Sequence, residues 1–196
     1  MEKTAKALEG KGHKVKVVAN EAEALSHIAT LLKDGVSVSA GGSTTLTQIG
    51  FSEFLRAQGD RIDNIKGKAA AAAEKGNMPE HYALLAKGLT ADLFFSSVTA
   101  VAESGEILGV DLTGTRVGGW ITSKQLVLVV STNKIVADLA ETEKRLEYQL
   151  KLESARVRVA YKVPASAAQN RLVIAGGNPF NPGRIHVILI EKTLGF

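Results

Sequence analysis

Short runs of almost uninterrupted apolar residues, rich in valine and isoleucine, recur along the chain and alternate with longer stretches of helical period. Strands that are apolar on both faces are typical of a parallel sheet covered by helices on both sides. Strand, helix and strand in this order require right-handed crossovers, which favours a doubly wound α/β fold. The strands that we expect span residues 15–19, 36–40, 93–98, 126–131 and 185–190.

The segments between these runs place apolar residues at the spacing of one helical face. Helical periods extend over residues 21–33, 79–88 and 138–150. The alanine-rich segment before Gly76 predicts a short surface helix, because alanine is the best helix former. Residues 161–184 contain three of the four prolines, so we expect turns there and a return to the last strand.

Composition limits the classes of protein to which this chain can belong. Its 196 residues suffice for one domain with a full core, so we expect a single domain over residues 1–196. Lys and Arg number 24 against 20 Asp and Glu, a small surplus spread along the chain, and only 5% of the residues are aromatic. Nucleic-acid binders usually show clustered basic residues with aromatics between them, so we expect no nucleic-acid partner.

Cysteine is absent, which excludes disulfides, a thiolate nucleophile and a cysteine metal site. The four histidines lie at no metal-ligand spacing, so we expect neither a metal nor another cofactor. No segment has the length of a signal peptide's apolar core or of a membrane span. We therefore expect a soluble cytoplasmic protein that does not contact a membrane.

The stretch SVSAGGSTTLTQIG, residues 37–50, passes from a strand through two glycines into a helical period. Gly41 and Gly42 permit a close approach of the backbone to a ligand. The hydroxyls of Ser43 and Thr44 can cap the helix or bind a carboxylate or phosphate, and a helix start at this edge of a parallel sheet often binds anions. The glycine patterns of nucleotide sites are absent. The alternative is a turn capped by Ser43 that binds no ligand.

A second informative stretch spans residues 96–119. A strand leaves the core, turns at Glu-Ser-Gly and continues to Asp111, and Gly114 then ends it before a short helix that contains Arg116. Glu103 in the turn is a candidate nucleophile or general base. Arg116 can pair bidentately with an anionic substrate, Asp111 can help to orient it, and Gly114 is a further candidate for substrate binding. The alternative is a solvated hairpin whose carboxylates have no catalytic role.

Several segments together resemble the LUD-domain family, which is named for lactate utilisation. The resemblance implies the fold of the superfamily that contains phosphosugar isomerases and CoA transferases. That fold is a Rossmann-like, mostly parallel α/β sheet with helices on both faces and an added antiparallel piece. The segments that carry the resemblance cover nearly the whole chain in order and are residues 14–25, 37–51, 91–119, 127–146 and 183–196.

The resemblance also implies roles for particular residues. In the superfamily, the glycine-rich turn after an early strand commonly holds a phosphate or carboxylate. This supports a ligand-binding role for four residues: Gly41, Gly42, Ser43 and Thr44. Glu103 matches the position from which CoA transferases draw their catalytic glutamate. Relatives of this length often carry a cysteine cluster before the last strand; this chain lacks it, so no redox role of those cysteines transfers.

The leading hypothesis is a protein linked to lactate or related organic-acid utilisation that binds a small anionic metabolite: a carboxylate, a phosphate or a CoA ester. If it is an enzyme, we expect a CoA transferase-like or isomerase-like activity that uses Glu103, with Gly42 facing this glutamate. One alternative is a non-enzymatic subunit that binds a companion redox protein. Another is an isomerase of phosphorylated sugars, for which Asp111 and Lys124 are candidates. A homodimer is the commonest state for such a domain.

Overall fold

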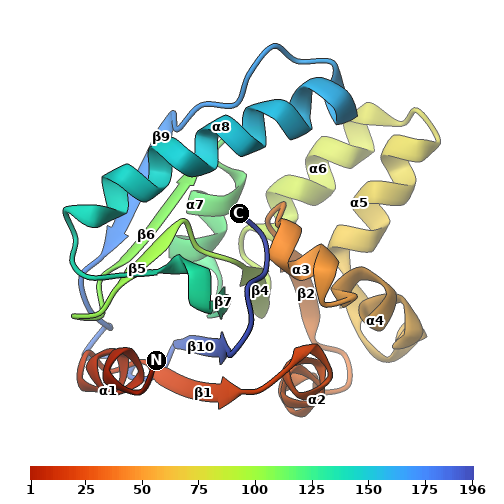
Figure 1. The fold of residues 1–196 in the computed structure, drawn as a ribbon. Helices are drawn as coiled ribbons and strands as arrows, with labels where there is room; N and C mark the ends of the chain where they lie inside the picture. The colour runs from red at the N-terminus through yellow and green to blue at the C-terminus, as the bar shows by residue number, and fades with distance from the viewer.

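A parallel sheet of six strands forms the centre of the protein (Figure 1). The computed structural model describes residues 1–196, apart from the side chain of Tyr161. Every pairing in this sheet is parallel, as the apolar runs predict. Its strands, in order across the sheet, are β1 (Lys14–Val18), β10 (Ile185–Ile190), β7 (Gln125–Ser131), β4 (Leu93–Ser96), β2 (Ser37–Ala40) and β3 (Asp63–Asn64).

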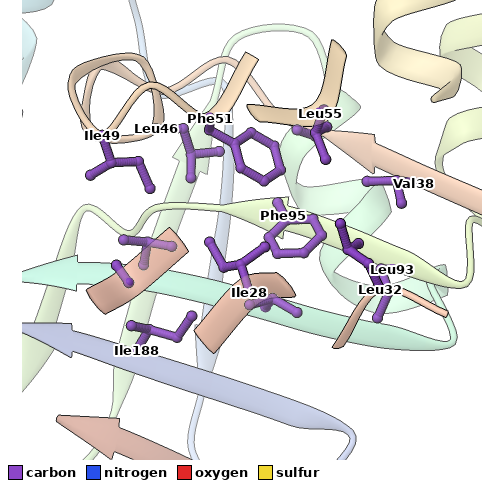
Figure 2. Packing of buried hydrophobic residues seen from close by; sticks show 14 of the residues in the cluster. Ile28, Leu32, Val38, Leu46, Ile49, Phe51, Leu55, Leu93, Phe95 and Ile188 are labelled. Carbon is purple, nitrogen blue, oxygen red and sulfur yellow. The ribbon is translucent and has the colours of Figure 1, made fainter. Parts of the chain in front are cut away.

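Three helices cover one face of the sheet: α2 (Glu21–Leu31), α3 (Thr44–Gln48) and α4 (Phe51–Ala57). Figure 2 shows their apolar side chains packed onto the strands. Phe51 of α4 lies against Phe95 of β4, with ring centroids 4.7 Å apart, and Ile28 of α2 is fully buried. Each such side chain contributes about 1.5–3 kcal/mol through burial. This cluster fixes the end of β2 and the start of α3 against the middle of the sheet.

The opposite face carries α1 (Glu2–Gly10), α7 (Thr115–Thr122), and the packed pair α5 (Ile65–Glu74) and α6 (Met78–Gly88). Trp120 of α7 is fully buried and fills the space beside Gly109, where a Cβ would meet its ring. Gly88 approaches Ser39 of β2 in the same way. Two short 3-10 helices are labelled η1 (Gly59–Arg61) and η2 (Thr132–Lys134).

A second sheet of four strands packs on this face and is covered outside by α8 (Glu141–Tyr161) (Figure 1). Leu146 of α8 packs onto Leu108 and Val110 of the sheet. The antiparallel pairs β5–β6 and β6–β9 confirm the expected antiparallel addition. The strands, in order, are β8 (Ile135–Val136), β5 (Ala100–Ala102), β6 (Ile107–Asp111) and β9 (Asn170–Ile174).

The structure differs from the sequence prediction in four places. Strand β9 lies within residues 161–184, where only turns were expected, because its pairing with β6 supplies hydrogen bonds that local patterns do not reveal. Helix α8 continues to Tyr161, and α1 was not predicted. The alanine-rich α5 buries Ala69 and Ala72 and is therefore only partly a surface helix. In the part of the chain that the structure describes, no helix combines the length and apolarity needed to span a bilayer.

Candidate functional site

The glycine turn, residues 41–43, leads from the carboxyl end of β2 into α3. The Gly41 N–H donates to the carbonyl of Phe95 at 3.0 Å, which extends the pairing of β2 with β4. Ser43 is the N-cap of α3, and its Oγ accepts from the Leu46 N–H at 3.2 Å. Because α3 has only five residues, its dipole adds little to anion binding. Whether the turn can bind an anion therefore depends on the residues beside it.

Arg116 of α7 lies directly against the glycine turn. A Cβ on Gly41 would be 3.4 Å from the Cβ and Cγ of Arg116, an ordinary van der Waals distance, so the arginine packs directly against the turn. The guanidinium donates through Nη2 to the carbonyl of Gly42 and through Nη1 to that of Val110, the latter at 2.7 Å. Burial lowers the pKa of Arg116, and its Nε–H has no partner. The two stretches that stood out in the sequence meet at this contact.

Asp111 holds the start of α7 and so orients Arg116. Its carboxylate accepts from the backbone N–H groups of Gly114, Arg116 and Val117 at 2.6–2.8 Å. A further bond of 2.8 Å comes from the side-chain amide of Asn170 in β9. Gly114 adopts a positive φ of 83°, which admits the turn into the helix. The structure shows a capping function for Asp111 and Gly114, whereas their binding of substrate stays a prediction.

Lys134, at the end of η2, is a buried residue that the sequence analysis missed. Its side chain donates from Nζ to Thr45 Oγ1 and to Ser97 Oγ, both at 2.8 Å, and the residue is only 5% exposed. Among the described residues it forms no ion pair with a carboxylate. Burial, and then the charges of Arg145 and Arg116, lower the pKa of Lys134 to about 7. Both protonation states are therefore populated at neutral pH.

Arg145 of α8 completes what we call the cation cluster: Lys134, Arg116 and Arg145. Its Nη2 donates to the carbonyl oxygen of Phe196, its Nε–H has no partner, and burial lowers its pKa. Neither arginine forms an ion pair with any carboxylate that the structure describes. The carboxylates of Asp111 and Glu153 act on Arg116 through space and offset part of its charge, but no ion pair compensates the buried charge of Lys134, which is costly. Such an arrangement is typical of a site that binds an anion.

Glu103 does not belong to this site. It lies in the turn between β5 and β6, which packs beside α1 and away from α3 (Figure 1). Its carboxylate pairs with Lys3 at 2.7 Å and its side chain is 40% exposed. The hydrogen bond from Lys3 lowers the pKa of Glu103. The expectation that Gly42 faces this glutamate is therefore wrong, and a catalytic role of Glu103 stays a prediction without support from the geometry.

A groove of about 850 Å³ opens beside the glycine turn, between α4 and α5. Gly41, Gly42 and Ser43 line one part of it. The rest carries charges of both signs, such as Arg56 and Asp60, so the groove favours neither anions nor cations. Within the described residues, no group of three or more acidic or histidine side chains could hold a metal ion. The cation cluster is thus the stronger candidate for a binding site.

One sequence signal could have revealed Lys134. It lies three residues beyond Ser131, where β7 ends in the middle of the large sheet. The carboxyl ends of central parallel strands are the usual place for ligands in α/β proteins. A lone lysine directly after such a strand is therefore a reasonable site candidate, even without a motif around it.

Comparison with known proteins identifies the family. A family model for the LUD domain matches residues 1–190. The chain belongs to the LUD-domain family. Its fold resembles the crystal structure of a DUF162 family protein from Deinococcus radiodurans, with a TM-score of 0.56 and 15% identity over 97% of this chain and 95% of that one. A search of curated proteins gives no match. Family membership and fold predicted from the sequence are thus confirmed.

Proposed function

We propose that this LUD-domain protein binds a small organic anion, a carboxylate or a phosphate, at the cation cluster beside the glycine turn. The observation that carries the proposal is that Lys134 is buried and Arg116 and Arg145 are half-buried beside it, while none of the three forms an ion pair with an Asp or Glu side chain that the structure describes. An anion would supply the missing counter-charge. A role in the utilisation of lactate or related organic acids is consistent with the name of the family.

The donors in the cluster suit a carboxylate or phosphate. The unpartnered Nε–H groups of Arg116 and Arg145 belong to planar guanidinium forks, which match the oxygen atoms of these anions. The hydroxyls of Thr45 and Ser97 lie 2.8 Å from Lys134 Nζ and can rotate to donate as well.

Residues 194–196 lie over the cation cluster. The Leu194 N–H donates to Asn133 Oδ1 at 3.3 Å, and the Gly195 N–H donates to Gln48 Oε1 at 2.6 Å. The Phe196 carbonyl oxygen already accepts a hydrogen bond from Arg145. A ligand anion would compete with this main-chain oxygen for the guanidinium of Arg145.

Thermal unfolding in the presence of candidate ligands tests the proposal. We expect stabilisation by at least one of lactate, pyruvate, sugar phosphates and CoA esters, of about 2.7 kcal/mol at a hundred times the dissociation constant. Arg145→Gln should remove this effect, because it deletes a charge from the cluster. Arg158→Gln is the matched control, since Arg158 lies on the exposed face of the same helix.

Two results would contradict anion binding at this site. One is an unchanged ligand effect in Arg145→Gln. The other is the absence of stabilisation by every compound, which would favour the alternative of a non-enzymatic subunit that binds a companion redox protein.

A further inference from the structure

We propose that the bound anion also carries a ketone or aldehyde group, and that Lys134 attacks this carbonyl carbon to form an imine. The inference rests on the proposed function, because the arginines of the cation cluster would hold the anionic end of the same molecule. It adds a chemical reaction to what is otherwise a binding site.

The surroundings of Lys134 suit a neutral amine. Buried lysines are usually held by a carboxylate, which keeps them charged and unreactive. Lys134 instead contacts two hydroxyl oxygens, those of Thr45 and Ser97, each 2.8 Å from Nζ. A hydroxyl both donates and accepts, so the same two contacts accommodate the charged and the neutral amine.

The neighbouring arginines favour the reactive form further. Burial and the charges of Arg145 and Arg116 lower the pKa of Lys134 to about 7. Lysines that form imines are commonly activated in this way, by an apolar setting or by an adjacent cation. The same arginines that attract the anion therefore also free the electron pair of the nucleophile.

The reaction step balances without a further reagent. The Nζ electron pair forms a bond to the carbonyl carbon while the carbonyl π electrons move to oxygen. One proton then passes from nitrogen to oxygen through the hydroxyl of Ser97 or Thr45, which gives a carbinolamine. Loss of this hydroxyl with the remaining nitrogen-bound proton releases one water molecule and leaves the imine. Nothing is oxidised or reduced.

The ligand class is a small carbonyl compound with an anionic group. Both 2-keto acids and phosphorylated ketones have this chemistry, so both are tested. Pyruvate and dihydroxyacetone phosphate are the probes, and lactate is the control because it has the carboxylate of pyruvate but no carbonyl group. Lactate should bind without reacting.

Reductive trapping tests the proposal on the full chain. The protein is incubated with each probe and sodium cyanoborohydride at pH 7, and its intact mass and peptides are measured. We expect one adduct on Lys134, with the mass of the probe less one oxygen atom. It should form at least about tenfold faster than adducts on exposed lysines, because an ordinary lysine, with a reference pKa near 10.4, is almost wholly protonated at pH 7. The probe that reacts faster identifies whether a carboxylate or a phosphate is preferred.

Three variants make the result specific. Lys134→Arg keeps the charge and Lys134→Met keeps the length, and both should abolish the adduct. Lys151→Arg, on the exposed surface of α8, should leave it unchanged. Circular dichroism and thermal unfolding establish that the Lys134 variants are folded, so that loss of the adduct reports on chemistry.

Two outcomes would overturn the inference, and they differ in what they imply for the proposed function. If pyruvate and lactate both stabilise the protein but no adduct forms on Lys134, the imine is excluded and anion binding stands. The same holds if the adduct is spread evenly over exposed lysines. If neither probe nor lactate stabilises the protein and no adduct forms, the proposed function fails as well.

Discussion

The glycine turn and the turn between β5 and β6 are both conspicuous in the sequence, but the charged side chains beside them differ in burial and in ion pairing. Beside the glycine turn, one buried lysine and two half-buried arginines form no ion pair with an acidic side chain that the structure describes. At the second turn, Glu103 pairs with Lys3 at 2.7 Å and Glu106 with Lys11 at 2.9 Å, near the surface. Exposed pairs contribute about 0–1 kcal/mol, whereas an uncompensated buried charge costs several. Burial without a counter-charge is therefore the better guide to a site.

The largest stability effect should come from Asp111, which supports the glycine-turn region through α7. Asp111→Ala removes the acceptor for three backbone N–H groups and the Asn170 amide, so we expect a loss of about 3 kcal/mol in the free energy of unfolding. Urea denaturation measures it. Asp138→Ala is the control, because Asp138 accepts only the Glu141 N–H of α8, at 3.0 Å. Equal losses in both variants would contradict the assignment.

Lys134→Met should increase the free energy of unfolding and abolish the proposed imine formation. The substitution removes an unpaired buried charge and keeps the volume, so we expect a gain of roughly 2 kcal/mol at pH 7. The pKa of Lys134 is about 7 in the folded protein, below the value of about 10.4 expected in the unfolded chain. Above pH 7 the unfolded chain therefore holds the extra proton, and raising the pH stabilises the wild-type protein.

The difference between wild type and Lys134→Met should thus be constant below pH 7 and shrink from pH 7 to 9. Urea denaturation at several pH values measures this difference, in which the titration of other groups cancels. A difference independent of pH over that range would mean that Lys134 is charged throughout, and would remove the basis for its reactivity.

A smaller effect is expected at Gly195, which lies over the cation cluster. Its φ is +66°, and a Cβ there would lie 2.5 Å from Thr45 Oγ1 and 3.1 Å from Lys134 Nζ. Gly195→Ala should therefore cost about 1–2 kcal/mol and displace residues 195–196 from the site. Gly10→Ala is the control, since a Cβ at Gly10 meets no neighbour. Trapping with pyruvate should become faster in Gly195→Ala, because the segment that covers Lys134 is displaced; an unchanged rate would show that this segment does not limit access.

The smallest effect should be that of Glu103→Gln. Its ion pair with Lys3 is exposed on both sides and screened by solvent, so the free energy of unfolding should not change measurably. Ligand stabilisation and trapping at Lys134 should be unchanged. A loss of either in Glu103→Gln would reverse the comparison between the two turns and restore the glutamate to the mechanism.

Local patterns predicted the large sheet well. Strand β10 begins and ends where its apolar run does, at residues 185–190, with His186 as the single polar residue, and the glycine turn is marked by its own residue types. Strand β9 was missed because its edge position leaves alternate residues partly exposed and its partner β6 is distant in sequence. Lys134 was missed for a related reason, since Thr45, Ser97 and Arg145 come from three separate elements. No local pattern reports the absence of a carboxylate among such neighbours.

Lys134 also lies at the junction of the two sheets. Strand β7 of the large sheet ends at Ser131 and β8 of the small sheet begins at Ile135, so only the short helix η2 connects these two strands. Thr45 lies in α3, which comes directly after β2 of the large sheet. Arg145 lies in α8, the helix that covers the small sheet. Any shift between the two sheets would change the spacing of the positive charges. We therefore expect substitutions in the layer formed by α8 to change the affinity of the proposed site for an anion without contacting the anion.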